Sequence, residues 1–419
     1  IDFDAMRERF GQLAFDMIDT DQPLDVPVAY ALARMGDEKL LNAGKSAGFI
    51  QLNNDKIRFT HQLMLEYFAA EGLYRVGVET RIAEPEVKSY WREAQKWDQV
   101  VIALSGTFEE PDNLINQIGE IDPFLAANCV TSKIVVQNTC KETIINNLIR
   151  FREARGATKL VVNSLAKIDI PLSAQVLIEF LGNYIRQITT VAIDALVKLS
   201  PISIPALIEA LLHANNANIR ENSAKALGII GEADTVPYLL QALSDPSLDV
   251  CLATINSLST IGDSRAVPYL VDIILNNDDF NLRYFAIDAI KDFNDPETIP
   301  VLLQVLREPP DAMLASMIAD EAEASLASLG VLAIPAMIDL LGSPDREIAI
   351  RVLSQIGESA IQPLQQALNS QNELVNESAV EALGYIGVSA VPTLIDVLNH
   401  PYIKVRCSAA KSLGKIGDS

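Results

Sequence analysis

Residues 218–231 read NIRENSAKALGIIG, residues 404–417 read KVRCSAAKSLGKIG, and related versions lie between them. The shared pattern is small-x-x-Ala-Leu-Gly-x-Ile-Gly-Asp/Glu, then a short loop, Val-Pro-x-Leu, and an apolar helix that ends in Asn/Ser-Asp/His-Pro. A period of roughly 30 residues that carries two helical patterns is typical of an α-solenoid. Such units bury their apolar faces only against their neighbours, so their usual product is a long binding surface rather than a catalytic pocket.

A proline marks the start of each predicted second helix. Consecutive prolines are 32, 31, 32 and 35 residues apart, and the last interval of 57 residues holds two units: Pro205, Pro237, Pro268, Pro300, Pro335 and Pro392. Proline suits the first helical turn, because the N–H that it lacks has no intrahelical partner there. Glycine with a positive φ is predicted to close the first helices, at Gly231, Gly262, Gly357, Gly387 and Gly417.

Three arginines recur near the start of first helices, Arg220, Arg283 and Arg406. Arginine at this place is predicted to bond neighbouring loops and helix ends and so to join successive units. His213 and His400 close second helices, where a cation suits the helix dipole, and neither is expected to be a ligand.

Residues 1–80 follow a different pattern. The short apolar runs 49–52 and 57–59 flank a polar turn, which predicts a β-hairpin. Thr60 is then expected to cap a helix that continues to about Leu73. Helices followed by a two-stranded wing describe a winged-helix module.

The predicted fold class is therefore all-α apart from that hairpin. A winged-helix-like module occupies residues 1–80, and a wholly helical linker or capping region occupies residues 81–170. An α-solenoid follows over residues 171–419, with about eight repeats of which the last is incomplete.

Composition narrows the classes of function. The net charge of −22 opposes binding to nucleic acid or to an anionic membrane, because phosphate contacts need clustered Lys and Arg. No apolar run reaches the roughly 18 residues that span a bilayer, and no signal peptide is visible, so a cytoplasmic location is expected. The three histidines and four dispersed cysteines show no spacing typical of a metal site.

Two family resemblances rest on these patterns. The Ala-Leu-Gly-x-Ile-Gly-Asp skeleton resembles HEAT repeats of the subgroup named after phycobilisome lyases. Residues 58–70, RFTHQLMLEYFAA, resemble the winged-helix segment that follows the nucleotide-binding core of NACHT-type signalling ATPases, with its pattern Phe-x-His-x-x-x-x-Glu-Tyr/Phe-Phe-Ala-Ala. Together they imply the C-terminal half of a bacterial NACHT–HEAT protein of the STAND NTPase class, cyanobacteria being one source. We therefore expect a fragment that continues in at least one direction.

The NACHT resemblance carries expectations about nucleotide. In that family, nucleotide-controlled opening drives oligomerisation, and the repeats sense a ligand or restrain the ATPase. The resemblance implies ADP or ATP and a nucleotide-dependent homo-oligomer in the parent protein, with no cofactor held by this fragment alone. It also implies that His61, the histidine of the motif, contacts the β-phosphate of bound ADP. The first turn of a helix favours an anion; the alternative is a histidine that only packs or helps to cap the helix.

Gly44-Lys45-Ser46 copies the end of a Walker A loop. That motif also needs a glycine five residues before Gly44, where Lys39 stands, with a strand before it and a helix after it. Here a helix is predicted before the tripeptide and a strand after it. We therefore expect no phosphate loop, and no ATP hydrolysis by this stretch of chain alone.

The second helices offer a candidate binding surface. In HEAT arrays these helices line the concave face, and the residue four places after each proline position is acidic or an amide: Glu209, Gln241, Asp272, Gln304, Asp339, Gln366 and Asp396. The residue one place after the proline is tyrosine in two adjacent repeats, Tyr238 and Tyr269. Such a surface would suit a basic or amide-rich peptide or protein. The alternative is the polar stripe that any amphipathic helix needs.

Three functions stay open at this point. The leading prediction is a non-enzymatic regulatory and protein-interaction region of a NACHT-type signalling ATPase, in which the winged helix senses ADP and the solenoid binds a partner or autoinhibits. The rival is a bilin lyase-like or pigment-handling protein, which would bind an open-chain tetrapyrrole. The third is a plain protein-binding scaffold. The Phe-x-His segment fits the first and has no role in the second, whereas the repeats alone do not separate the three.

Overall fold

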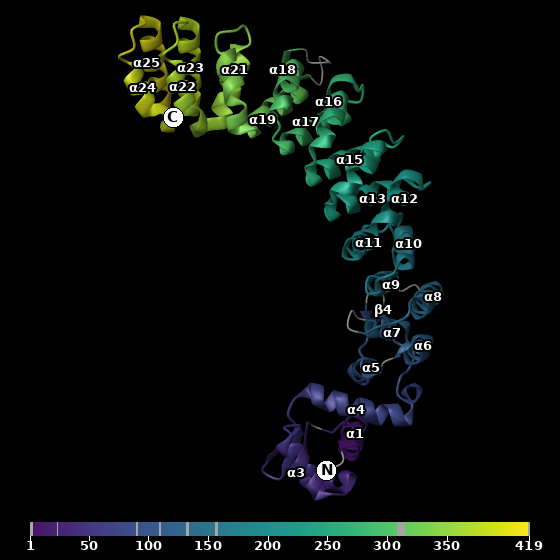
Figure 1. Ribbon diagram of the computed structural model, residues 1–419. Coiled ribbons are helices and arrows are strands. Elements are labelled where there is room, and N and C mark those ends of the chain that lie inside the picture. Colours follow the sequence, from purple (N-terminus) through teal and green to yellow (C-terminus); the bar gives the residue numbers. More distant parts are fainter. Residues whose placement is uncertain are drawn as a thin grey trace. The chain divides into compact units, whose positions relative to one another are not determined.

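The computed structural model describes residues 3–22, 24–88, 91–108, 110–130, 134–155, 158–307 and 315–417. The chain divides into two compact units, Ile1–Leu207 and Ile208–Ser419, and each is described by itself. Both units are built mainly from helices, and the strands of the described residues all lie in the first (Figure 1). Among the described residues, no helix is both long and apolar enough to cross a membrane.

The first unit begins with helices around a small antiparallel sheet. Its elements are α1 (Phe3–Asp19), β1 (Asp25–Pro27), α2 (Val28–Met35), α3 (Glu38–Ser46), β2 (Ile50–Asn53), β3 (Lys56–Phe59) and α4 (Gln62–Val76). The predicted hairpin is confirmed, since β2 pairs with β3 through a turn in which Asn54 and Asp55 have φ of 46° and 60°. Positive φ at both turn residues matches the twist of a two-residue hairpin. The strand order β1-β3-β2 adds a third strand that the sequence analysis missed.

The core of this module explains the Walker-like tripeptide. Phe10 of α1 is fully buried and packs against Phe59 and Phe68, with ring centroids 6.1 and 5.4 Å apart. Gly44 lies in α3 directly against the Phe10 ring, where a Cβ has no room. Packing accounts for the glycine, and the tripeptide ends a helix instead of preceding one.

Residues 78–129 contain η1 (Val78–Thr80), β4 (Val87–Lys88), β5 (Trp91–Arg92), α5 (Asp98–Ser105), α6 (Asp112–Ile121) and α7 (Pro123–Cys129). The prediction that residues 81–170 are wholly helical is wrong here, because β4 pairs with β5. This short ladder carries Arg92 into a buried site, where its Nη2 lies 2.7 Å from Asp98 Oδ1 and its Nε 2.6 Å from Asp122 Oδ2. Burial raises the pKa of the Asp122 carboxyl despite the neighbouring Arg92 guanidinium.

Asp122 also shows why α7 begins where it does. Its Oδ1 accepts hydrogen bonds of 3.0 Å from the backbone N–H groups of Phe124 and Leu125, as an N-cap residue does. The rest of the first unit is a series of helices. They are α8 (Asn138–Arg155), α9 (Thr158–Leu165), α10 (Pro171–Phe180), α11 (Arg186–Lys198) and α12 (Ile204–His213), and the boundary between the two units, after Leu207, falls in α12. Helices α8, α9 and α10 each pack against the next.

The second unit alternates long first helices with short second helices, from α13 in teal to α25 in yellow (Figure 1). The first helices are α13 (Ala217–Ile230), α15 (Leu248–Ile261), α17 (Phe280–Ile290), α19 (Ala315–Ser328), α21 (Arg346–Ile356), α23 (Glu373–Ile386) and α25 (Ile403–Gly417). The second helices are α14 (Val236–Ala242), α16 (Val267–Asn276), α18 (Ile299–Arg307), α20 (Ile334–Leu340), α22 (Ile361–Ala367) and α24 (Val391–Val397). Each first helix packs against the next first helix, so the all-α solenoid prediction is confirmed.

Short 3-10 turns join the first helices to the second ones. They are η2 (Ala233–Thr235), η3 (Ser264–Ala266), η4 (Lys291–Phe293), η5 (Pro296–Thr298), η6 (Gly330–Leu332), η7 (Gly357–Ala360) and η8 (Val388–Ala390). Gly231 and Gly262 end α13 and α15 in the left-handed conformation, with φ of 77° and 69°. Glycine adopts this φ without strain, as predicted. Gly417 differs, because it is the last residue of α25 and stays helical, so its predicted closing role is wrong.

Candidate partner-binding face

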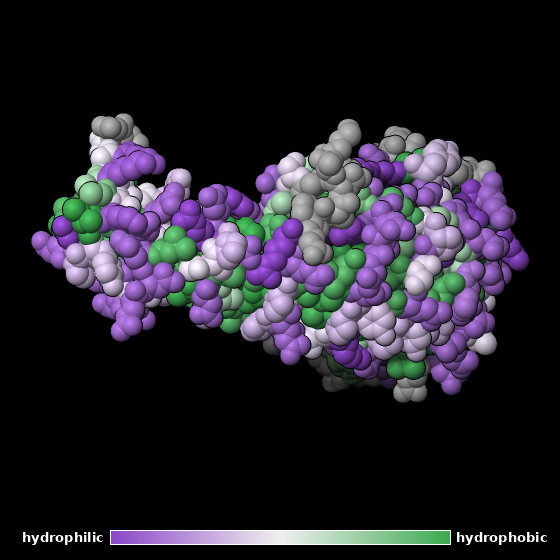
Figure 2. Space-filling view, turned by 90° about the horizontal axis from the view of Figure 1, so that it is seen from above, coloured by the Kyte–Doolittle hydropathy of each residue, from purple (hydrophilic) through white to green (hydrophobic). Residues whose placement is uncertain are grey.

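All seven polar residues predicted for the second helices are exposed. Glu209 lies on α12, and the others lie one to a helix on α14, α16, α18, α20, α22 and α24: Gln241, Asp272, Gln304, Asp339, Gln366 and Asp396. We call the surface formed by these seven residues with Tyr238 and Tyr269 the second-helix face. The structure thus gives successive helices a polar, partly acidic side chain at one position each. Figure 2 shows hydrophilic side chains over much of the surface seen from above, with hydrophobic areas between them.

Two aromatic rings depart from this polar pattern. Tyr238 on α14 and Tyr269 on α16 are 40% and 51% exposed, so the core does not require their rings. Neither hydroxyl has a hydrogen-bond partner within the described residues. The neighbouring repeats carry smaller side chains at the same position, Ala206, Val301, Ala336 and Thr393. Exposed tyrosine, with an apolar ring and a polar tip, is typical of binding surfaces.

One largely buried ion pair lies beside the helix that carries Tyr238. Arg220 of α13 pairs with Asp245, which follows α14, at 2.7 and 2.9 Å, and its Nη1 donates to the carbonyl of Ala214 at 2.8 Å. Burial alone would raise the pKa of Asp245, but the Arg220 guanidinium and the Ser247 amide outweigh it and lower that pKa. The predicted joining role of Arg220 is therefore confirmed.

The other two arginines behave differently from each other. Arg406 donates to the carbonyls of His400 and Pro401 at 2.9 and 3.0 Å, so its predicted role is confirmed. Arg283 was predicted to do the same, and this is wrong within the described residues: its Nε is buried without a hydrogen-bond partner, and burial lowers its pKa.

A hollow of about 240 Å³ lies between α22 and α24. It is lined by the predicted Asp396 and by residues that helical counting missed, chiefly the amides of Gln365, Asn369 and Asn399. His400 borders it but is engaged: Nδ1 accepts from the Tyr402 N–H at 3.3 Å, which leaves Nε2 to donate to the Leu368 carbonyl at 3.0 Å. The hollow therefore offers amide groups and one carboxylate, which suit a peptide backbone and a basic side chain.

His61, in the first unit, lies one residue earlier relative to α4 than predicted. It is the N-cap of α4, with φ −138° and ψ 149°, and its exposed side chain makes no capping hydrogen bond. Thr60 does not cap the helix, because its hydroxyl donates to the carbonyl of Gly48 at 2.6 Å and closes the hairpin instead. His61 and Arg58 line a hollow of about 190 Å³ beside Asp25. The contact between His61 and ADP stays a prediction.

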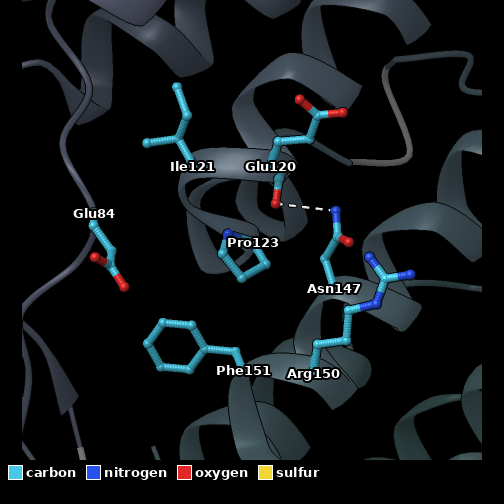
Figure 3. A pocket seen from close by; sticks show the side chains of 8 residues that line it. Glu84, Glu120, Ile121, Pro123, Asn147, Arg150 and Phe151 are labelled. Atoms are coloured by element: carbon cyan, nitrogen blue, oxygen red, sulfur yellow. Dashed lines mark hydrogen bonds between the residues drawn. The ribbon is translucent and has the colours of Figure 1, made fainter. Parts of the chain in front are cut away.

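A larger hollow of about 470 Å³ lies in the first unit (Figure 3). The side chains around it come from the loop at Glu84, from α6 and the start of α7, and from Asn147, Arg150 and Phe151 of α8. Asn147 Nδ2 donates to the Gly119 carbonyl at 3.1 Å and so fixes α8 to α6. The lining mixes two carboxylates, a guanidinium and an aromatic ring, and the sequence analysis singled out none of these residues as a site. Among the described residues, no three His, Cys, Asp or Glu side chains cluster to hold a metal ion.

Comparison with protein families identifies the class of repeat. The family described as HEAT repeats matches residues 204–283, 236–323 and 361–419, and the family described as PBS lyase HEAT-like repeat matches residues 345–370. The chain therefore contains HEAT repeats, one of them of the phycobilisome-lyase type, as the first resemblance implied. No curated protein matches the sequence significantly.

Solved structures match the chain at low sequence identity and low TM-score. Kap121p bound to Nup53p is 12% identical with a TM-score of 0.43, and the match covers 99% of this chain and 53% of that one. Kap95 in the Kap95:Nup1 complex is 13% identical with a TM-score of 0.37, covering 98% and 62%. The complex of CpcE and CpcF of phycocyanin lyase from Nostoc sp. PCC7120 is 19% identical with a TM-score of 0.30, covering 58% and 94%.

Proposed function

We propose that this chain is the regulatory and partner-binding region of a NACHT-type signalling ATPase, and that the second-helix face binds the protein partner. The observation that carries the proposal is the row of seven exposed acidic or amide side chains at one position of successive second helices. A HEAT solenoid is suited to protein interaction, and an acidic row on it favours a basic or amide-rich partner. The reaction chemistry of the whole protein would belong to the ATPase part.

The binding role is tested by reversing charge on one set of helices at a time. The variant Asp272→Lys, Asp339→Lys, Asp396→Lys changes three exposed residues of second helices. The matched control Asp249→Lys, Glu347→Lys, Glu381→Lys changes three exposed carboxylates of first helices by the same total charge. Proteins that co-purify with the wild type should be lost with the first variant and kept with the second. Equal loss, or retention by both, contradicts the proposal.

The nucleotide-sensing role rests on the segment at residues 58–70 and on the place of His61. The free N–H groups at the start of α4 and the cation of Arg58 favour an anion, while Asp25 opposes one. The full-length protein should release ADP on denaturation, and His61→Ala should lower the amount recovered. Leu63→Ala, which changes a side chain 77% exposed in the same turn, is the control. Equal nucleotide in both variants would count against a role for His61.

Pigment handling is the second candidate, favoured by the match of residues 345–370 to PBS lyase HEAT-like repeats. An open-chain tetrapyrrole bound to the protein would shift and sharpen its visible absorbance. We expect no such change, and a stoichiometric spectral shift would favour this candidate over the first.

A further inference from the structure

We propose that Tyr238 and Tyr269 form a docking site for a proline-rich, basic segment of a partner protein in the polyproline II conformation. The inference rests on the proposed function of the second-helix face and names the class of segment that this face would bind. It begins from the two rings that the fold does not need: they are 40% and 51% exposed, and their hydroxyls have no partner within the described residues.

The two rings occupy equivalent places on adjacent repeats. The sequence Val-Pro-Tyr-Leu occurs at residues 236–239 and again at 267–270, and in both copies the proline and tyrosine are exposed while the flanking Val and Leu are buried. Helix α14 contacts η3, the turn that leads directly into α16, so the two second helices are neighbours. The first helices of these two repeats, α13 and α15, pack directly against each other. Packed helices lie about 8–10 Å apart, and this spacing of the repeats sets the approximate separation of the two rings.

That separation matches one turn of a polyproline II helix. The conformation has about three residues per turn and a rise of about 3.1 Å per residue, so side chains at i and i+3 lie roughly 9 Å apart on one side. Proline rings spaced by three would therefore meet Tyr238 and Tyr269 in register. A regular β-strand repeats its side chains every two residues, about 6.6 Å, and fits the spacing less well.

The residues beside each ring supply the polar contacts. Gln241 lies three residues after Tyr238, and Asp272 lies three residues after Tyr269, so each shares a helix side with its ring. The side-chain amide of Gln241 has no hydrogen-bond partner within the described residues and can bond the solvated backbone of such a helix. Asp272 accepts one bond from Asn276 at 2.7 Å and keeps lone pairs for a Lys or Arg. The net charge of −22 favours the same basic segment.

The test is a binding titration of the full chain with fluorescent synthetic peptides, read by anisotropy. The first peptide carries proline at every third residue with lysines between. The second has the same composition with prolines two and four residues apart, and the third replaces lysine by glutamate. We expect the first peptide to bind about fivefold or more tightly than either of the others. Equal affinity for the first two would overturn the register argument.

The variants Tyr238→Ala and Tyr269→Ala should each weaken binding of the first peptide about fivefold. Asp272→Asn should weaken it and reduce its dependence on salt. Tyr385→Ala, at the end of α23 and 60% exposed, is the control and should leave affinity unchanged. Circular dichroism checks that each variant keeps its helices, and Tyr238→Leu retains apolar bulk without a ring if the alanine variant is unstable. The same affinity in the tyrosine variants and the control refutes the site.

Failure of this proposal is distinguishable from failure of the proposed function. If no peptide binds but partners are still lost with the charge-reversal variant of the second helices, the face binds protein of another class. If neither experiment gives a difference between second and first helices, both ideas fail together.

Discussion

The substitution Gly228→Ala should disturb the contact between two successive first helices, α13 and α15, and lower the stability of the protein. Gly228 of α13 faces Ser257 of α15, and a Cβ added at 228 would lie 2.6 Å from the Cβ and Oγ of Ser257 and 2.8 Å from its Cα. Rotation of Ser257 would move only Oγ, so the two helices must separate. The Ser257 hydroxyl also donates to the Ala224 carbonyl of α13 at 2.8 Å, and this bond would be strained.

The size of the effect follows from two opposed terms. Overpacking of a tight contact lowers the free energy of unfolding by about 1–3 kcal/mol. Replacing glycine by alanine inside a helix raises it by about 0.5–1 kcal/mol. We expect a net loss of about 1–2 kcal/mol in the free energy of unfolding. Gly414→Ala on α25 is the matched control, because nothing lies within 4 Å of a Cβ there. It should be neutral or slightly stabilising.

The assay is urea unfolding followed by circular dichroism, with hydrogen exchange of α13 and α15 as the local measurement. Local exchange is needed because repeat arrays depart from two-state unfolding. Ser257→Gly should restore part of the lost stability when combined with Gly228→Ala, since it removes the clashing atoms. A Gly228→Ala variant as stable as Gly414→Ala would refute the packing argument.

The remaining predictions concern buried charge. Arg92→Met leaves Asp98 and Asp122 buried without their cation and should cost about 3–5 kcal/mol of unfolding free energy. The control is Arg81→Met, because the pair of Arg81 with Asp19 is about one-third exposed. Equal melting temperatures of the two variants would contradict this prediction. Arg220→Met should cost about 3 kcal/mol at neutral pH, because it removes the largely buried pair with Asp245. Since Arg220 lowers the pKa of Asp245, that stability is present above the unfolded pKa of about 3.9 and is lost as the pH falls through the folded value. The difference between wild type and Arg220→Met in urea unfolding should therefore shrink from pH 7 toward pH 3, and a difference independent of pH would be inconsistent with it.

Local signals in the sequence predicted much of the fold. The polar turn at residues 53–55 indicated the hairpin. The prolines indicated where the second helices begin, because proline favours the first turn of a helix. Counting four residues from each proline found exposed positions because the helical period fixes which side of a helix a residue occupies.

Features that depend on distant contacts escaped prediction. Strand β1 has three residues, including Pro27, and is defined only by pairing with Arg58 and its neighbours about 30 residues later. Strands β4 and β5 are two residues each, and the reason for them is the burial of Arg92 beside Asp98 and Asp122. Thr60 had a capping sequence, yet its hydroxyl found the Gly48 carbonyl across the hairpin.

The same distinction applies to the candidate sites. The exposed row and the two tyrosines could be found by counting along single helices. The amide-lined hollow between α22 and α24 could not be found in this way. Gln365 and Asn369 form a hollow only together with Asp396 and Asn399, which come from a later part of the chain. The hollow beside Arg150 likewise needs α6 and α8 to be side by side.

Photo-cross-linking in cells from chosen exposed positions can show whether the second-helix face binds the partner. A photoreactive amino acid replaces Gln304 or Gln366 on second helices, and Asn256 or Gln355, exposed amides of the first helices α15 and α21, as controls. A partner bound to the second-helix face should give a discrete adduct from the second-helix positions and none from the first-helix positions. Adducts of equal yield from both sets, or from the first helices alone, would contradict the claim that the second-helix face binds the partner.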